Sequence, residues 1–184
     1  LVGTDKMNDV AVLKIKASGL TPAVYGNSDQ LQVGDMAVAI GNPLGEAFFR
    51  STTVGVVSSL ERKVEASVTD KYGRKSTTEN AMIQVDAAIN SGNSGGGMFN
   101  VLGQLMGIPS LKYTSSYFSS TSIDNIGMCI PINVAKPLIR EALEKYDAEN
   151  VQNYLNEITG GQDLAEFLKD TPEQKSFSLG SRVT

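Results

Sequence analysis

The chain has 184 residues, with 16 Lys and Arg against 20 Asp and Glu, and a formal net charge of −4. This length allows one large domain or two small ones with a sizeable core. No basic cluster occurs, which argues against nucleic acid as a partner. With one cysteine and no histidine, the sequence lacks the ligands of a zinc or iron–sulfur site, so we expect neither metal nor cofactor.

Short apolar or β-branched runs alternate with turn residues over the first 132 positions. The first expected strand covers residues 9–15, after a turn-like Gly3-Thr4-Asp5, and the later ones cover residues 36–40, 52–60, 81–85, 104–108 and 126–132. Residues 61–80 are polar and are expected to form a hairpin with a mobile loop, and residues 113–125 a second loop. Many short strands with turn signals between them predict an all-β sandwich or barrel.

The periodicity becomes helical after the last expected strand. Asn133 is a plausible helix cap and Pro137 suits a first turn. We expect a helical appendage of two or three helices over residues 133–170, packed outside the barrel, followed by a polar linker or tail at 171–184.

Cys129 lies in an apolar run at residues 126–131. No cationic residue flanks it, so we expect a buried thiol that behaves as a small hydrophobe and not a reactive one.

Gly92-Asn93-Ser94-Gly95-Gly96 carries the one clear chemical signal of the chain. A serine nucleophile needs an exposed hydroxyl, close backbone approach of the substrate, and converging amide donors for the oxyanion. Glycine at position 92 permits the backbone angles that turn its amide inward, and the Ser94 amide would be the second donor. An ordinary glycine-rich turn remains the alternative. A phosphate loop and a nucleophile elbow are not supported, because the expected flanking elements are strands.

Four segments together resemble the HtrA/DegP-type serine proteases. The stretch 84–97 is similar to their active-site strand and loop, and residues 9–15 to the segment with the catalytic aspartate. Residues 39–45 resemble the entry to the second barrel, and residues 126–131 the last strand before a C-terminal helix. The resemblance covers roughly residues 1–145 and preserves the order of the motifs.

The resemblance implies a chymotrypsin-like double β-barrel with a Ser-His-Asp triad. Ser94 matches the nucleophile and Asp9 the aspartate that orients the imidazole, with Gly92 and Ser94 as the oxyanion hole. Asp9 could instead be a solvated residue at a strand edge, and Asp5 is a competing carboxylate that fits the motif less well. A serine–lysine dyad with Lys14 or Lys112 is conceivable but has no local support.

The same mapping implies a specificity pocket made by Ala88, Ile89 and Leu111. A small neutral residue at position 88 argues against cleavage after Lys or Arg, and an apolar pocket discriminates weakly between aliphatic side chains. Ile89 could equally be an ordinary core residue.

The sequence departs from the family in having no histidine, and only eight residues precede Asp9. Losing the base of such a triad costs on the order of a millionfold in turnover. We therefore expect residues 1–31 to be the remnant of an N-terminal barrel, residues 32–132 to be a complete C-terminal barrel, and this chain alone to be inactive.

The parent protein is expected to be a serine endopeptidase that degrades misfolded or unfolded polypeptides. The resemblance further implies a trimer-based homo-oligomer that works outside the bacterial cytoplasm, in the periplasm or cell envelope or anchored to the membrane. Residues 61–80 and 112–125 are candidates for loops that order the site. The alternative is a catalytically inactive peptide-binding scaffold that kept the barrel.

Overall fold

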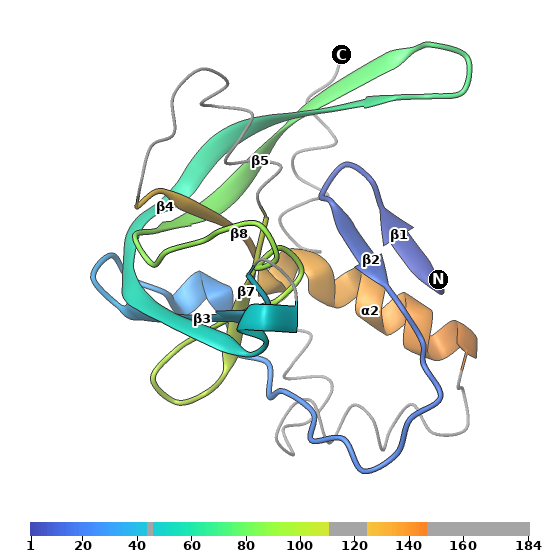
Figure 1. Cartoon of the computed structure of the whole chain (residues 1–184). Coiled ribbons are helices and arrows are strands. Elements are labelled where there is room, and N and C mark those ends of the chain that lie inside the picture. Colours follow the sequence, from blue (N-terminus) through green and yellow to red (C-terminus); the bar gives the residue numbers. More distant parts are fainter. Residues whose placement is uncertain (44–45, 111–124, 147–184) are drawn as a thin grey trace.

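The computed structural model describes residues 1–43, 46–110 and 125–146. Its largest unit is a closed barrel of six antiparallel strands in the order β3-β4-β5-β8-β7-β6, with β6 pairing back onto β3 (Figure 1). The strands are β3 (Met36–Gly41), β4 (Ser51–Thr69), β5 (Lys75–Val85), β6 (Gly97–Phe99), β7 (Leu105–Pro109) and β8 (Gly127–Pro131). Closure removes free strand edges from the barrel wall. The prediction of an all-β barrel is confirmed.

The barrel interior follows the alternation of side chains along each strand. On β3, Ala37 and Ala39 point inward and are fully buried, whereas Met36 and Ile40 lie on the outer face. The small alanines leave room for large methionine and β-branched side chains from the facing strands. The buried cluster contains Leu31, Ala37, Ala39, Val57, Ile83, Val85, Ala87, Met98, Met106 and Cys129.

A small hairpin of β1 (Gly3–Asp5) and β2 (Val10–Val12) precedes the barrel. The expected strand 9–15 is therefore too long: Asp9 lies in the turn with φ 59°, and Leu13 and Ile15 are about two-thirds exposed. The expected turn at residues 3–5 is instead strand β1. A strand persists only where a partner pairs with it, and β1 pairs with three residues of β2.

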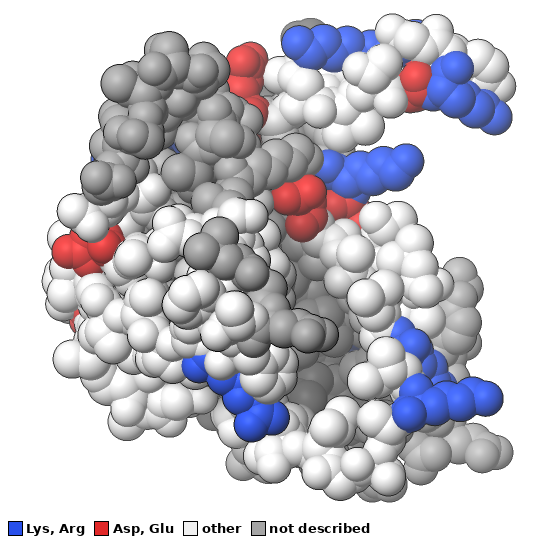
Figure 2. Space-filling model, viewed as in Figure 1, with Lys and Arg blue, Asp and Glu red and all other residues white. Residues whose placement is uncertain are grey.

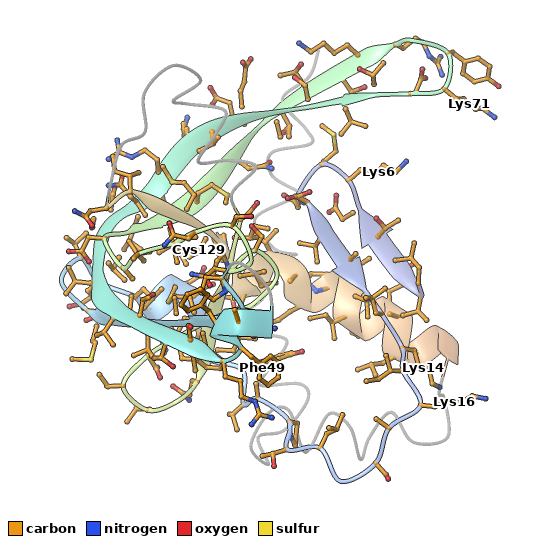
Figure 3. All side chains as sticks on the ribbon, viewed as in Figure 1. Lys6, Lys14, Lys16, Phe49, Lys71 and Cys129 are labelled. Carbon is orange, nitrogen blue, oxygen red and sulfur yellow. The ribbon has the colours of Figure 1, made fainter. Side chains whose placement is uncertain are left out.

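Strands β4 and β5 continue beyond the barrel as a long two-stranded ribbon (Figure 1). The prediction of a mobile loop over residues 61–80 is wrong in extent, because pairing continues to Thr69 opposite Lys75. Polar cross-strand pairs support the ribbon, including the Ser67 and Thr77 hydroxyls at 3.2 Å. Lys71 lies at its tip (Figure 3), and charges of both signs occur along it (Figure 2).

Helix α2 (Ile132–Tyr146) follows β8 directly and packs on β1, β2, β7 and β8. Asn133, expected as the cap, lies inside the first turn, and its backbone N–H donates to the Ser28 hydroxyl at 3.2 Å. A side chain of the 3-10 turn η1 (Ser28–Gln30) thus satisfies an amide at the helix start. Pro137 lies inside the helix, beyond its first turn.

A second 3-10 turn, η2 (Glu46–Phe48), precedes β4. The helices expected between residues 147 and 170, the tail at 171–184 and most of the loop at 113–125 lie outside the described residues. Among the described helices, none is long and apolar enough to cross a membrane.

Candidate active site

Ser94 lies on an exposed turn between β5 and β6, as the glycine-rich sequence predicts. The turn is attached to the barrel wall beside it, because the N–H of Gly95 donates to the carbonyl of Pro109 at 3.0 Å. Within the turn, the Gly96 N–H donates to the Asn93 carbonyl at 3.0 Å. These bonds hold the loop against the end of β7, and Ser94 is exposed.

The nucleophile loop packs on the end of β3. The N–H of Asn42 donates to the Gly92 carbonyl at 3.1 Å, and a Cβ on Gly92 would overlap the Asn42 carbonyl oxygen. Gly92 also has φ 101°, a conformation that side chains disfavour. A Cβ on Gly96 would overlap the Ile40 carbonyl oxygen. Glycine is therefore required where the loop lies directly on the β3 backbone.

Asp9 reaches the same region from the β1–β2 turn. Its Oδ2 accepts a hydrogen bond from the Ser110 hydroxyl at 3.1 Å, and Ser110 is almost fully buried. Ser110 directly follows Pro109, whose carbonyl binds the nucleophile loop. The carboxylate of Asp9 and the loop of Ser94 are thus anchored to adjacent residues at the end of β7.

Asp5, the competing carboxylate, has a local role. Its Oδ1 accepts from the N–H groups of Met7 at 3.0 Å and Asn8 at 3.1 Å, and its Oδ2 accepts from the Asn8 side chain at 2.6 Å. These contacts shape the turn that carries Asp9. Asp5 therefore orders the segment, whereas the Asp9 carboxylate bonds to Ser110 at the end of β7.

Two of the three expected pocket residues lie in the segment that leads into the nucleophile loop. The Ala88 side chain is exposed, and its carbonyl accepts from the Thr53 hydroxyl at 3.0 Å and from the Asn93 amide at 3.2 Å. Ile89 is half-buried and packs against the barrel core, where it contacts Gly127 so closely that a Cβ there would overlap it. Leu111 lies outside the described residues.

Sequence reasoning missed Ser110, Thr53 and the side chain of Asn93. Ser110 has a weak signal, since it is a polar residue directly after a buried strand. The described residues contain no group of three or more His, Cys, Asp or Glu side chains that could hold a metal.

The described residues thus combine a closed barrel with an exposed serine on a glycine-rich turn. A family profile described as "Trypsin-like peptidase domain" matches residues 1–108. The Bacillus subtilis "Serine protease Do-like HtrB" is 39% identical over 145 residues, covering 78% of this chain and 30% of the relative. The Chlamydia trachomatis "Probable periplasmic serine endoprotease DegP-like" is 35% identical over 190 residues, covering 96% and 35% respectively.

Solved structures agree with these relatives. The structure titled "HtrA-type protease AlgW with tripeptide" aligns with a TM-score of 0.59 and 33% identity over 78% of this chain and 43% of that one. The chain belongs to the trypsin-like peptidase domain family, as an HtrA-type member. It spans about a third of the length of the curated relatives it matches.

Proposed function

We propose that the protein is an HtrA-type serine endopeptidase that cleaves unfolded polypeptides through an acyl-enzyme on Ser94. The observation that carries the proposal is the joint anchoring of the Ser94 loop and the Asp9 carboxylate at Pro109 and Ser110. The alternative of an ordinary glycine-rich turn does not account for a carboxylate, from a hairpin far away in the sequence, that is bonded to the residue next to the turn's own anchor. The HtrA names of the relatives support the same reaction.

The roles follow from the chemistry of acyl transfer. The Ser94 hydroxyl attacks the scissile carbonyl, and the amides of Gly92 and Ser94 stabilise the oxyanion. A histidine takes the serine proton and returns it to the leaving amine, while Asp9 holds the imidazole in the required tautomer. These 184 residues contain no histidine, so we propose that the base comes from a part of the protein outside them.

The proposed substrate preference rests on the small side chain of Ala88 and on Ile89, with Leu111 as a third contributor. An apolar, uncharged pocket suits a Val, Leu, Ile or Ala side chain before the cleaved bond. Such a pocket discriminates only weakly between substrates with these side chains. Such a preference fits unfolded proteins, which expose aliphatic residues. No metal or cofactor enters this mechanism.

The names of two relatives include the word "periplasmic". We therefore propose that the protein works outside the cytoplasm. Its resemblance to the HtrA type favours a trimer-based homo-oligomer.

The test is cleavage of fluorescein-labelled unfolded casein by the protein extended upstream to include a histidine, with Ser94→Ala as the matched control. We expect cleavage after aliphatic residues that the control lacks entirely. A folded, extended protein that leaves casein intact would overturn the proposal and would favour a peptide-binding scaffold. Cleavage that persists in Ser94→Ala would exclude Ser94 as the nucleophile.

A further inference from the structure

Asn93, the residue directly before the nucleophile, is almost fully buried, with only 2% of its surface exposed. Its side-chain Nδ2 donates to the carbonyl of Ala88 at 3.2 Å. Its backbone N–H donates to the Asn90 carbonyl at 2.9 Å, and its own carbonyl accepts from Gly96 at 3.0 Å. The residue therefore bonds to the loop on both sides of Ser94.

The orientation of this carboxamide is determined by its surroundings. Nδ2 must face Ala88, because the reversed amide would direct an oxygen at the Ala88 carbonyl. Oδ1 then lies against Gly41 at the end of β3, where a Cβ would be 2.6 Å away. Among the described residues, this buried oxygen has no hydrogen-bond partner. A buried acceptor without a donor is costly, and each such group in a native structure calls for a physical explanation.

We propose that Asn93 is a positioning residue for peptide hydrolysis, which sets the distance between the nucleophile and the wall of the specificity pocket. This inference rests on the proposed function. Asn93 is covalently joined to Ser94, and its side chain holds the carbonyl of Ala88, the residue expected to border the pocket. The carboxamide fills the space between that carbonyl and Gly41 at the end of β3.

The Ala88 carbonyl accepts two hydrogen bonds from different parts of the chain. The Thr53 hydroxyl ties it to β4, and the Asn93 amide ties it to the nucleophile loop. Without the Asn93 bond, Ala88 remains hydrogen-bonded to Thr53 on β4, but the side chain next to Ser94 no longer holds Ala88. A displacement of about 1 Å between reacting groups can reduce turnover about a hundredfold.

The test uses Asn93→Asp in the extended, histidine-containing protein, with labelled casein as the probe. An ionised Asp cannot donate to the Ala88 carbonyl, whereas a protonated Asp can. Asn93 is hydrogen-bonded to Ala88, Asn90 and Gly96, and its Oδ1 lies against Gly41; none of these four residues is titratable. We expect kcat/KM at about pH 8 to fall about a hundredfold below wild type. The ratio of variant to wild type should then rise as the pH falls to about 5.5, because burial favours the neutral carboxyl.

Asn100→Asp is the matched control, because it makes the same chemical change in the β6–β7 turn. There Oδ1 accepts from the backbone N–H groups of Leu102 at 3.0 Å and Gln104 at 2.9 Å, and a carboxylate preserves both bonds. The Nδ2 donor to the Gln104 side chain at 2.9 Å is lost, as the Nδ2 donor is in Asn93→Asp. We expect its activity ratio to wild type to stay flat with pH.

Asn93→Ala provides a second variant without a buried charge, since it removes the donor and the unpartnered oxygen together. We expect a folded protein with a pH-independent loss of about tenfold or more in kcat/KM. Full activity in folded Asn93→Ala, or an Asn93→Asp ratio that does not change with pH, would overturn the inference. Lack of cleavage by wild type would contradict the proposed function instead, so the two failures are distinguishable.

Discussion

The hydroxyl of Ser110 donates to the carboxylate of Asp9 at 3.1 Å, across 101 residues of sequence. Ser110 is buried at the end of β7, and Asp9 is exposed in the β1–β2 turn. A buried hydroxyl has few alternative partners, so this bond restrains where the carboxylate points. It is the structural reason to expect that Asp9, and not Asp5, faces the catalytic base.

Substitution of the two aspartates tests this assignment. In the extended protein, Asp9→Asn should lower kcat by about 10⁴-fold, because the imidazole would adopt the wrong tautomer. Asp5→Asn is the matched control, since its carbonyl oxygen can still accept from the turn amides, and we expect less than about a tenfold change. Casein cleavage rates measure both. Equal losses in the two variants would contradict the assignment.

Gly92 and Gly95 both have left-handed backbone angles, with φ 101° and 80°, but only Gly92 is crowded by the β3 backbone. Gly95→Ala should cost about 1–2 kcal/mol through backbone conformation alone. Gly92→Ala should cost a further 1–3 kcal/mol or so, because its Cβ must displace the Asn42 carbonyl. Denaturant unfolding of both variants gives the comparison. Equal stabilities would mean that the loop does not lie on β3.

Cys129 is fully buried inside the barrel (Figure 3), and burial raises the pKa of its thiol to about 12. Because the thiolate is the reactive form, the native protein should not react with a disulfide reagent at about pH 8. One thiol should appear when the protein is unfolded in denaturant. Rapid labelling of the native protein would show that the barrel opens or that the thiol is accessible.

Asp70 forms the tip of the β4–β5 ribbon, where its Oδ1 accepts from the N–H groups of Arg74 and Tyr72 and its Oδ2 from the Arg74 side chain. Hydrogen bonds from the Arg74 backbone and then its side chain lower the pKa of the Asp70 carboxyl. The ordering of the tip is therefore present above the usual Asp pKa of about 3.9 and is lost as the pH falls through the lower, folded value.

A carboxyl NMR titration checks this prediction. The Asp70 midpoint should lie below that of an unperturbed Asp, and Arg74→Ala should raise it partway, because the backbone donors remain. A midpoint at the ordinary value in wild type would contradict the hydrogen-bonded tip.

Local sequence patterns predicted an all-β sandwich or barrel and the nucleophile loop, and the family resemblance favoured the barrel. Alternation of small and large apolar residues on β3, and glycines around Ser94, depend on neighbours within a few positions, so they can be interpreted without a structure. The ribbon was harder, because its Ser, Thr and Lys residues look like a loop. Its strands are stabilised by partners opposite them, such as Thr77 for Ser67.

The sequence by itself determined that the chain is built mainly from short strands, that a serine lies between glycines and that histidine is absent. Only the tertiary structure decided that Ser110 binds Asp9 and that Asn93 joins Ser94 to Ala88. Those bonds depend on how barrel closure brings the ends of β3, β5 and β7 together. Hydrogen bonds act over about 3 Å, and no local residue pattern encodes which distant side chains come within that range.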